Sequence, residues 1–168
     1  MEENKRDYKR EYIVLVVVVI LVVLDQITKI AAIHHNETFL IPNILKITIV
    51  QNRSGAFGVG GENIFLFIIT NIIVLGMIIR FILTQKQNID HKTIVSLTLV
   101  LSGGFSNLMD RLIRGYVVDY LDISQIIPFP KFNLADSYIV IGWILFALFF
   151  AIYSSRELKQ IRQKRPLA

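Results

Sequence analysis

Four long apolar segments, separated by polar stretches, dominate the pattern of this chain. They lie near residues 12–33, 64–83, 93–112 and 135–153, and each approaches the roughly 20 residues that a helix needs to cross the hydrocarbon of a bilayer. After the first and third segments, the sequence changes to short alternating runs and turn residues. The pattern therefore predicts an all-α membrane protein with four transmembrane helices and a small β-sheet and loop region at one membrane face.

The connections that follow the first and third segments contain strand-forming sequence. Over residues 45–50, Leu, Ile and Ile alternate with Lys, Thr and Val, which predicts a short strand. The glycines of SGAFGVGG (54–61) predict a turn, and GYVVDYLDI (115–123) is rich in residues that favour strands. The prolines of IPFPKF (127–132) oppose a continuous helix. We therefore expect a small sheet lying on the membrane surface.

Lysine and arginine gather in both tails and around the connection between the second and third segments. They are Lys5, Arg6, Lys9 and Arg10, then Arg80, Lys86 and Lys92, and finally Arg156, Lys159, Arg162, Lys164 and Arg165. Because cytoplasmic flanks hold an excess of these residues, both termini are predicted inside, with residues 34–62 and 113–134 outside. The net charge of +5 then indicates contact with anionic membrane lipids rather than with nucleic acid.

The composition supports a single membrane-embedded domain over residues 1–168, because 54% of the residues are hydrophobic and the mean hydropathy is +0.56. The first segment follows a basic tail, as a cleaved secretory signal would, but apolar character resumes after Lys29, so we expect an uncleaved span. The absence of cysteine excludes disulfides, thiolate metal ligands and a cysteine nucleophile. His34 and His35 are adjacent, a poor spacing for joint ligation, and we expect neither a metal site nor a cofactor.

Ionisable residues within the apolar segments gather toward the predicted outer face. Asp25 and Lys29 are spaced i,i+4 with the acid first, the favourable order for a helical ion pair. The third segment carries one polar stripe at intervals of three and four residues, formed by Gly103, Asn107, Asp110, Arg111 and Arg114. Charges at membrane depth mark functional sites by default. The alternatives are a structural ion pair and a helix-packing network, with Gly103 permitting close approach and Arg114 reaching the headgroups.

Two further aspartates flank the second outer connection. Asp119 lies in the predicted strand, and Asp136 lies near the first turn of the last helix, after Asn133 as a candidate N-cap. Because the third and fourth segments are antiparallel neighbours, both carboxylates can reach one outer pocket. Two carboxylates that share a site hold a single proton near neutrality, so that one activates water and the other donates to a scissile carbonyl. The helix N-terminus favours the ionised form of Asp136.

Each of these aspartates also has a simpler explanation, because Asp136 could serve only as a cap and Asp119 could be a solvated loop residue. Asp122 competes with Asp119 for the catalytic position. Period-two geometry directs these two side chains to opposite faces of a strand, so only one of them enters the pocket.

Four sequence blocks resemble the motifs of the lipoprotein signal peptidase family, the signal peptidase II of bacteria. They are DQITK (25–29), QNRSGAFG (51–58), GGFSNLMDRLIRGYVVDYLD (103–122) and FNLADS (132–137), and the resemblance covers nearly the whole chain. It implies an aspartic protease of the bacterial cytoplasmic (inner) membrane, with its active site at the outer face. Such an enzyme removes signal peptides from diacylglyceryl-modified prolipoproteins, cleaves before the lipidated cysteine, and is inhibited by globomycin-type cyclic peptides.

The resemblance also implies roles for particular residues. The catalytic dyad falls on Asp119 and Asp136. The positions that shape the pocket and hold the substrate are Asp25, Lys29, Asn52, Asn107, Asp110, Arg111 and Asn133. Hydrolysis of this kind needs no metal or organic cofactor, and we expect a monomer because the four spans enclose their own polar site.

Two positions depart from the family pattern. The family usually shows N-x-G-A-A after the first strand, whereas here Ser54 stands at the glycine position and Gly55 follows, which puts the expected backbone contact in question. Ser106 replaces the glycine that commonly precedes the asparagine of the third-helix motif. Serine is small enough to keep close packing, so we expect little functional consequence there.

A small proton-coupled membrane transporter is the alternative function, because intramembrane Asp, Lys and Arg also mark ion pathways. A continuous path would need polar residues on the inner halves of the helices, which hold little beyond Asn71 and Ser96. A non-enzymatic assembly subunit is a third possibility, and it would leave Asp119 and Asp136 purely structural.

Overall fold

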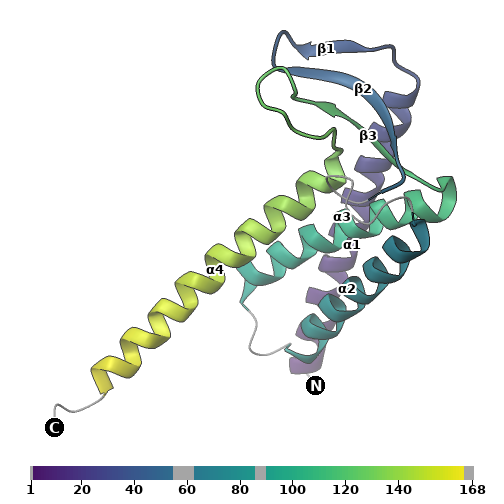
Figure 1. Cartoon of the computed structure of the whole chain (residues 1–168). Helices are drawn as coiled ribbons and strands as arrows, with labels where there is room; N and C mark the ends of the chain where they lie inside the picture. The colour runs from purple at the N-terminus through teal and green to yellow at the C-terminus, as the bar shows by residue number, and fades with distance from the viewer. Residues whose placement is uncertain (1, 55–62, 86–89, 165–168) are drawn as a thin grey trace.

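The structure, a computed structural model, describes residues 2–54, 63–85 and 90–164, and within them the chain forms four helices and three strands (Figure 1). In chain order these are α1 (Glu2–Ile33), β1 (Thr38–Ile41), β2 (Leu45–Asn52), α2 (Ile64–Thr84), α3 (His91–Arg114), β3 (Val117–Asp122) and α4 (Leu134–Lys164). The turn predicted from SGAFGVGG lies, from Gly55 onward, outside the described residues.

Three of the described helices are long and apolar enough to cross a membrane: α1 over Lys9–Ile33, α2 over Ile64–Thr84 and α4 over Leu134–Ile152. Large apolar side chains on all three are exposed, including Ile13 at 52%, Phe65 at 73% and Ile144 at 61%. Surfaces of this kind face lipid rather than water. These three helices are therefore candidate membrane spans at the predicted places, whereas α3 does not reach the same apolar composition.

The lower apolarity of α3 has a physical reason in its position, because this helix packs against α1, α2 and α4. Its buried residues include Ser96, Thr98, Ser102, Ser106 and Asn107, so its polar positions face protein. The apolar core lies around the same helix and consists of Val18 of α1, Leu75, Ile78 and Ile82 of α2, and Leu97, Val100, Leu101 and Leu108 of α3.

Glycine sets the close crossing of α3 and α4. A Cβ built on Gly103 would overlap the carbonyl oxygen of Ala135 and would lie 2.7 Å from Ile139 Cγ1. On the facing helix, a Cβ on Gly142 would lie 2.7 Å from the Ser96 carbonyl oxygen. The close approach expected at Gly103 is confirmed, and it brings the first turn of α4 against the polar stripe of α3.

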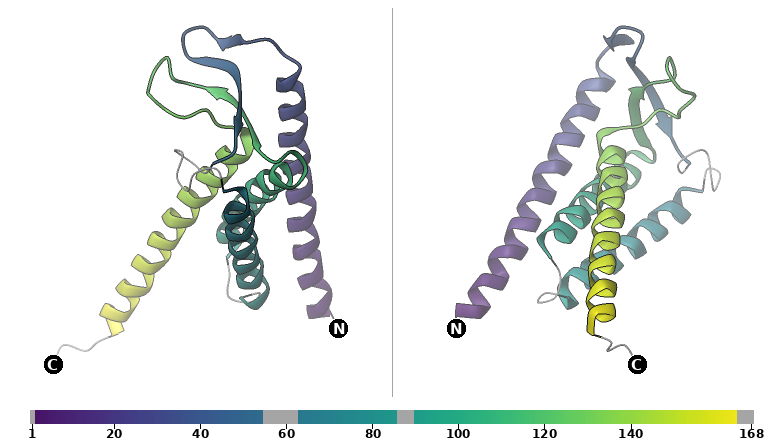
Figure 2. Two further views of the ribbon diagram at one scale, coloured as in Figure 1. Left: turned by 45° about the vertical axis from the view of Figure 1, so that its right-hand side comes forward. Right: turned by 90° about the vertical axis from the view of Figure 1, so that its left-hand side faces the viewer.

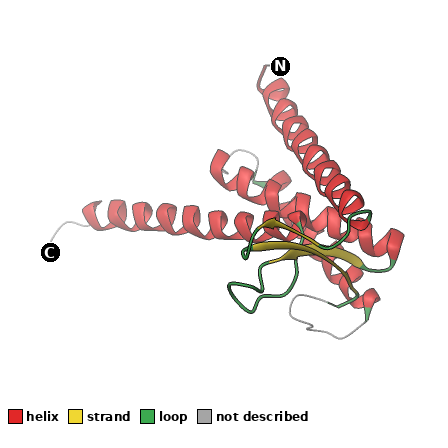
Figure 3. Cartoon of the chain, turned by 90° about the horizontal axis from the view of Figure 1, so that it is seen from above, coloured by secondary structure: helices red, strands yellow, loops and turns green. Residues whose placement is uncertain are grey.

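The three strands form an antiparallel sheet in the order β1-β2-β3. Val50 pairs with Asp119 and Asn52 with Val117, with an irregularity between Ile47 and Val50. The sheet lies at one end of the helix bundle, and both chain termini lie at the other (Figures 1 and 2). Figure 3 shows from above that α1 and α4 point apart as they run away from the sheet. The strands predicted at 45–50 and within 115–123 are thus confirmed.

Candidate active site

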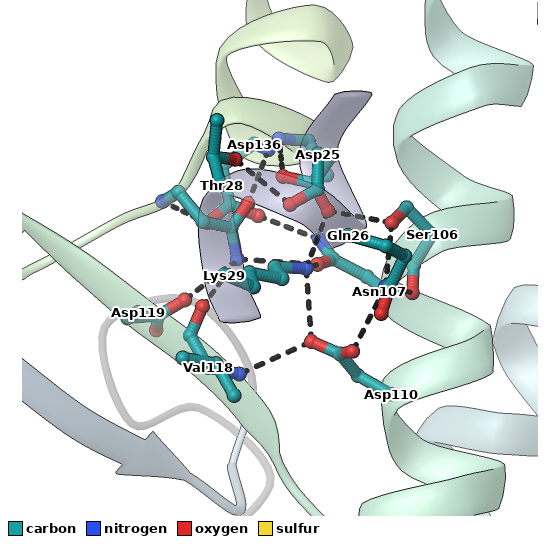
Figure 4. A network of polar contacts seen from close by, with 12 residues as sticks. Asp25, Gln26, Thr28, Lys29, Ser106, Asn107, Asp110, Val118, Asp119 and Asp136 are labelled. Carbon is teal, nitrogen blue, oxygen red and sulfur yellow. Dashed lines mark hydrogen bonds and ion pairs between the residues drawn. The ribbon is translucent and has the colours of Figure 1, made fainter. Parts of the chain in front are cut away.

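One buried polar network occupies the end of the bundle beneath the sheet (Figure 4). Hydrogen bonds and ion pairs within it join all nine residues that the sequence singles out: Asp25, Lys29, Asn52, Asn107, Asp110, Arg111, Asp119, Asn133 and Asp136. These residues come from α1, β2, α3, β3 and the start of α4. Segments that are far apart in the sequence therefore meet at one site.

Lys29 lies at the centre of this network. Its Nζ lies 2.7 Å from Asp25 Oδ2 and 2.9 Å from Asp110 Oδ2, and it donates to Asn107 Oδ1 at 3.0 Å. The side chains of Lys29, Asp25 and Asp110 are fully buried. An ammonium group has three donors, so each finds an acceptor here, which is the condition for keeping a charge away from water. The i,i+4 pair predicted between Asp25 and Lys29 is confirmed.

Asp110 attaches β3 to α3. Its Oδ2 accepts the backbone N–H of Val118 at 3.1 Å, and Val118 directly precedes Asp119. Its Oδ1 accepts from Gln26 Nε2 at 3.0 Å and also contacts the Arg114 guanidinium. Arg114 therefore pairs with a buried carboxylate rather than reaching only for lipid headgroups, and the strand that carries Asp119 is held against the helix.

Asp25 fixes the start of α4 in the same way. Its Oδ1 accepts the backbone N–H of Ala135 at 2.8 Å, and Ala135 directly precedes Asp136. Its Oδ2 accepts from Ser106 Oγ at 2.5 Å in addition to the contact with Lys29. Asp25 and Asp110 thus hold the two segments that carry Asp119 and Asp136, and Lys29 joins them.

Asn133 caps α4 and contacts both aspartates of the predicted dyad. The backbone N–H of Asp136 donates to Asn133 Oδ1 at 2.8 Å, while the backbone N–H of Asn133 donates to Asp136 Oδ2 at 3.1 Å. This reciprocal pair is a capping box and confirms the predicted N-cap. The side-chain Nδ2 of Asn133 also donates to Asp119 Oδ1 at 2.8 Å, so one residue connects the two carboxylates.

The second oxygen of each carboxylate accepts from another asparagine. Asn107 Nδ2 donates to Asp136 Oδ1, and Asn52 Nδ2 donates to Asp119 Oδ2, both at 2.8 Å. Asp119 is only 2% exposed, whereas Asp136 is half-buried. Burial first, and then the nearby charge of Asp136, raise the pKa of Asp119 to about 7, against the opposing effect of the Asn52 hydrogen bond. At a pKa of about 7, the Asp119 carboxyl group takes up a proton at a much higher pH than an ordinary aspartate does.

Asp122 lies outside this arrangement. Its Oδ1 accepts the backbone N–H of Ser124 at 2.9 Å, and its Oδ2 lies 3.7 Å from Lys131 Nζ. The Ser124 hydrogen bonds lower the pKa of Asp122 below its ordinary value. Asp122 thus has partners of its own outside the network, whereas Asp119, three residues earlier on the strand, belongs to it.

Arg111 and Ser54 lie beside the carboxylates. Arg111 donates from Nη1 to the Asn107 carbonyl at 3.2 Å, and its guanidinium lies 5.4 Å from the ring centre of Phe67. Its buried Nε has no hydrogen-bond partner among the described residues. The backbone N–H of Ser54 donates to Asn52 Oδ1 at 3.0 Å, which orients the Asn52 amide toward the strand. The backbone contact expected at the family's glycine position is not tested by this hydrogen bond, and Gly55 lies outside the described residues.

Sequence reasoning missed several members of the network. Gln26 Nε2 donates to Ser106 Oγ at 2.9 Å, and Gln26 Oε1 accepts from Arg114 at 2.9 Å. Tyr120 Oη donates to Thr28 Oγ1 at 2.8 Å and ties β3 to α1. Gln26, Thr28 and Tyr120 lie within the quoted family blocks but were given no role, and Ser106 was noted only as a departure from the family pattern. Its hydroxyl does more than pack, because it forms a hydrogen bond with a buried carboxylate.

A mostly helical membrane protein that holds two carboxyl groups together at one end of its bundle has the architecture of a membrane-embedded aspartic peptidase. Comparison with protein families agrees, because a family model described as "Signal peptidase (SPase) II" matches residues 17–152. The chain therefore belongs to the signal peptidase II family of aspartic peptidases.

Known relatives and solved structures support this membership. A protein named "Lipoprotein signal peptidase" from Streptococcus agalactiae serotype V is 37% identical over 139 residues, which cover 80% of this chain and 89% of that protein. Another of the same name, from Halothermothrix orenii, is 36% identical over 140 residues, covering 81% and 93%. A structure described as "Bacterial membrane enzyme structure by the in meso method at 2.3 A resolution" is 30% identical, with a TM-score of 0.75 and coverage of 92% and 93%. A second, at 1.9 Å, is 31% identical with a TM-score of 0.73 and coverage of 82% and 91%.

Proposed function

We propose that this protein removes the signal peptide from diacylglyceryl-modified prolipoproteins and cleaves the peptide bond before the lipidated cysteine. Family membership and the names of the relatives support the substrate class. The observation that carries the catalytic part is the pairing of Asp119 and Asp136 through Asn133, with the pKa of Asp119 raised to about 7. Such a pair supplies both a proton donor and a proton acceptor at the same pH.

In the proposed reaction, Asp119 begins protonated and Asp136 begins ionised. Asp136 takes a proton from water as the water oxygen bonds to the scissile carbonyl carbon, and Asp119 donates its proton to the carbonyl oxygen. The tetrahedral intermediate then collapses. The cysteine nitrogen takes the proton from Asp136, the C–N bond breaks, and the proton on the former carbonyl oxygen returns to Asp119.

The residues around the dyad divide by exposure. Asp25, Lys29 and Asp110 have fully buried side chains whose charged atoms already have partners. We assign them to positioning β3 and the start of α4, rather than to direct substrate contact as the family resemblance suggests. Asn52 and Arg111 are only partly buried, so parts of both side chains remain accessible beside the dyad. Direct substrate contact is therefore assigned to these two residues.

Asn107 and Asn133 keep the two carboxylates in place. Each donates from its side-chain amide to one carboxylate oxygen, and Asn133 Nδ2 also lies 3.2 Å from Asn107 Oδ1. Because amide donors hold both acids before substrate arrives, little reorganisation is needed during the reaction. A globomycin-type cyclic peptide that occupies the space beside the dyad should block the reaction.

We propose that α3 also crosses the membrane, which gives four spans in total. This helix runs between the same two ends of the bundle as its neighbours, and α1, α2 and α4 pack around it (Figure 2). Both termini lie at the end opposite the sheet and carry basic sequence, so we place that end in the cytoplasm. The dyad then lies at the outer face of the bacterial inner membrane, where a lipid-anchored substrate would present its scissile bond. We also expect the protein to act as a monomer.

Cleavage of a purified, diacylglyceryl-modified prolipoprotein tests this function. We expect the wild-type protein in detergent to release a signal peptide whose mass ends one residue before the modified cysteine. A matched prolipoprotein with serine at that cysteine cannot be lipidated and should remain intact. Equal cleavage of both substrates would refute the proposed substrate class. Failure to cleave either substrate would refute the proposed peptidase activity and favour the alternative function, a proton-coupled transporter.

A further inference from the structure

A groove of about 490 Å³ lies between α1 and α3 at the end of the bundle opposite the sheet. The α1 wall contains Val14 and Val17, and the α3 wall contains Ile94, Val95 and Leu99. The volume falls within the roughly 300–1,000 Å³ typical of sites for small ligands. This groove is separate from the carboxylate network, whose α1 members begin at Asp25.

The groove follows from how the two helices cross. The hydrogen bonds that α1 makes to α3 side chains come from Gln26 and Lys29, close to the sheet. Further along α1, Val18 packs into the apolar core with Leu97 and Leu101. Beyond Val18, toward the chain terminus, the lining side chains no longer fill the space between the helices. An apolar gap at this depth in a bilayer is filled by hydrocarbon rather than by water.

Basic and polar side chains line one end of the groove. Lys9 and Arg10 of α1 lie there together with His91, the first residue of α3. Among the described residues, neither Lys9 nor Arg10 forms an ion pair. Among the residues whose side chains are described, the acidic neighbours in sequence are Glu11 and Asp90, and neither lines the groove. Asp90 instead caps α3 by accepting the Thr93 N–H at 3.0 Å.

We propose that this groove binds one anionic phospholipid of the cytoplasmic leaflet. One acyl chain lies between Val14, Val17 and Val95, while the phosphate contacts Lys9 and Arg10. Charge complementarity selects the lipid, because the walls accept any acyl chain but the mouth presents positive charge that favours an anionic headgroup. The leaflet assignment rests on the topology proposed above, whereas the headgroup preference rests only on the groove.

Native mass spectrometry of the full-length protein released from detergent tests this proposal. The probes are phosphatidylglycerol and phosphatidylethanolamine with identical acyl chains. Wild type should retain one phosphatidylglycerol in preference to phosphatidylethanolamine. At roughly 1 kcal/mol for each basic residue near an anionic lipid surface, each of Lys9→Gln and Arg10→Gln should weaken retention about fivefold. Val95→Trp, which fills the groove without changing charge, should abolish retention.

Arg80→Gln is the matched control. Arg80 is an exposed basic residue on α2, at the same end of the bundle as Lys9 and Arg10, and it does not line the groove. It should retain the lipid as wild type does, and all variants should still process prolipoprotein, which shows that they are folded. Equal retention of both lipids would overturn the proposal. A loss of lipid retention in Arg80→Gln as large as that in Lys9→Gln would also overturn it. Unchanged retention in Val95→Trp, or the mass of a lipid-free dimer in place of the lipid-bound monomer, would do the same.

Discussion

Replacing Lys29 with methionine is the sharpest test of how the site is held together. Methionine keeps a long apolar stem but removes the ammonium group that contacts Asp25 at 2.7 Å, Asp110 at 2.9 Å and Asn107 at 3.0 Å. Removing one partner of a fully buried ion pair typically costs about 3–5 kcal/mol, because the remaining charge stays buried without compensation. We therefore expect Lys29→Met to lose about 3–5 kcal/mol of unfolding free energy.

The structure also predicts which of the two carboxylates would carry that cost. Asp110 keeps a second cation, because Arg114 contacts its Oδ1. Asp25 keeps only neutral donors, the Ser106 hydroxyl and a backbone N–H. Adding Asp25→Asn to Lys29→Met should therefore recover roughly 1–3 kcal/mol, the cost of one unsatisfied buried group. Adding Asp110→Asn should recover less, because that change also weakens the contact with Arg114.

Denaturant titration in mixed micelles measures these differences, and the single tryptophan, Trp143 on α4, provides the fluorescence signal. The four proteins to compare are wild type, Lys29→Met and the two double variants. A loss below about 1 kcal/mol in Lys29→Met, within the range of an exposed ion pair, would refute the central role of this residue. Greater recovery with Asp110→Asn than with Asp25→Asn would refute the assignment of the uncompensated charge.

Three other changes test separate parts of the site. Because the pKa of Asp119 is raised to about 7, the pH–rate profile of prolipoprotein cleavage should fall as pH rises through that value and the acid loses its proton. Asn52→Leu removes a hydrogen bond that lowers this pKa, so the fall should move to higher pH, and an unchanged position would contradict the assignment. Ser106→Ala should lower the unfolding free energy by about 1.5–3 kcal/mol, the usual value for a hydrogen bond to a charged group. A negligible loss in denaturant titration would show that the Ser106–Asp25 hydrogen bond does not stabilise the fold. Gly103→Ala should cost roughly 1–3 kcal/mol by overpacking, whereas Gly76→Ala, where a Cβ meets nothing within 4 Å, is the control and should be nearly neutral in the same titration.

Short-range patterns in the sequence predicted the parts of the fold that depend on neighbouring residues. The period-two alternation over residues 45–50 gave β2, and the polar residue before an apolar run identified Asn133 as an N-cap. The i,i+4 spacing of Asp25 and Lys29 gave the ion pair. In each case the residues that determine the geometry lie within one or two turns of each other, so the sequence contains the necessary information.

Contacts between distant segments could not be predicted in this way. Ser106 and Asp25 are 81 residues apart, and their hydrogen bond depends on the rotation and crossing of α1 and α3. The lower apolarity of the third segment did not by itself show that α3 lies at the centre of the bundle, because that position depends on contacts with three other helices. For Arg114, the sequence could not reveal the Gln26 and Asp110 partners within reach, so contact with the headgroups was the expected alternative.

The most direct test of the account is the specificity constant, kcat/KM, for a purified diacylglyceryl-modified prolipoprotein with Asp119→Asn, Asp136→Asn and Asp122→Asn. Asp122→Asn is the matched control, because it makes the same side-chain change on the same strand as Asp119→Asn but outside the buried network. With folding verified by Trp143 fluorescence, we expect a loss of at least about 10²–10⁴-fold for each of the first two variants, the contribution of a general acid or base. Asp122→Asn should cleave at nearly the wild-type rate. Cleavage near the wild-type rate by either Asp119→Asn or Asp136→Asn would contradict the proposed dyad.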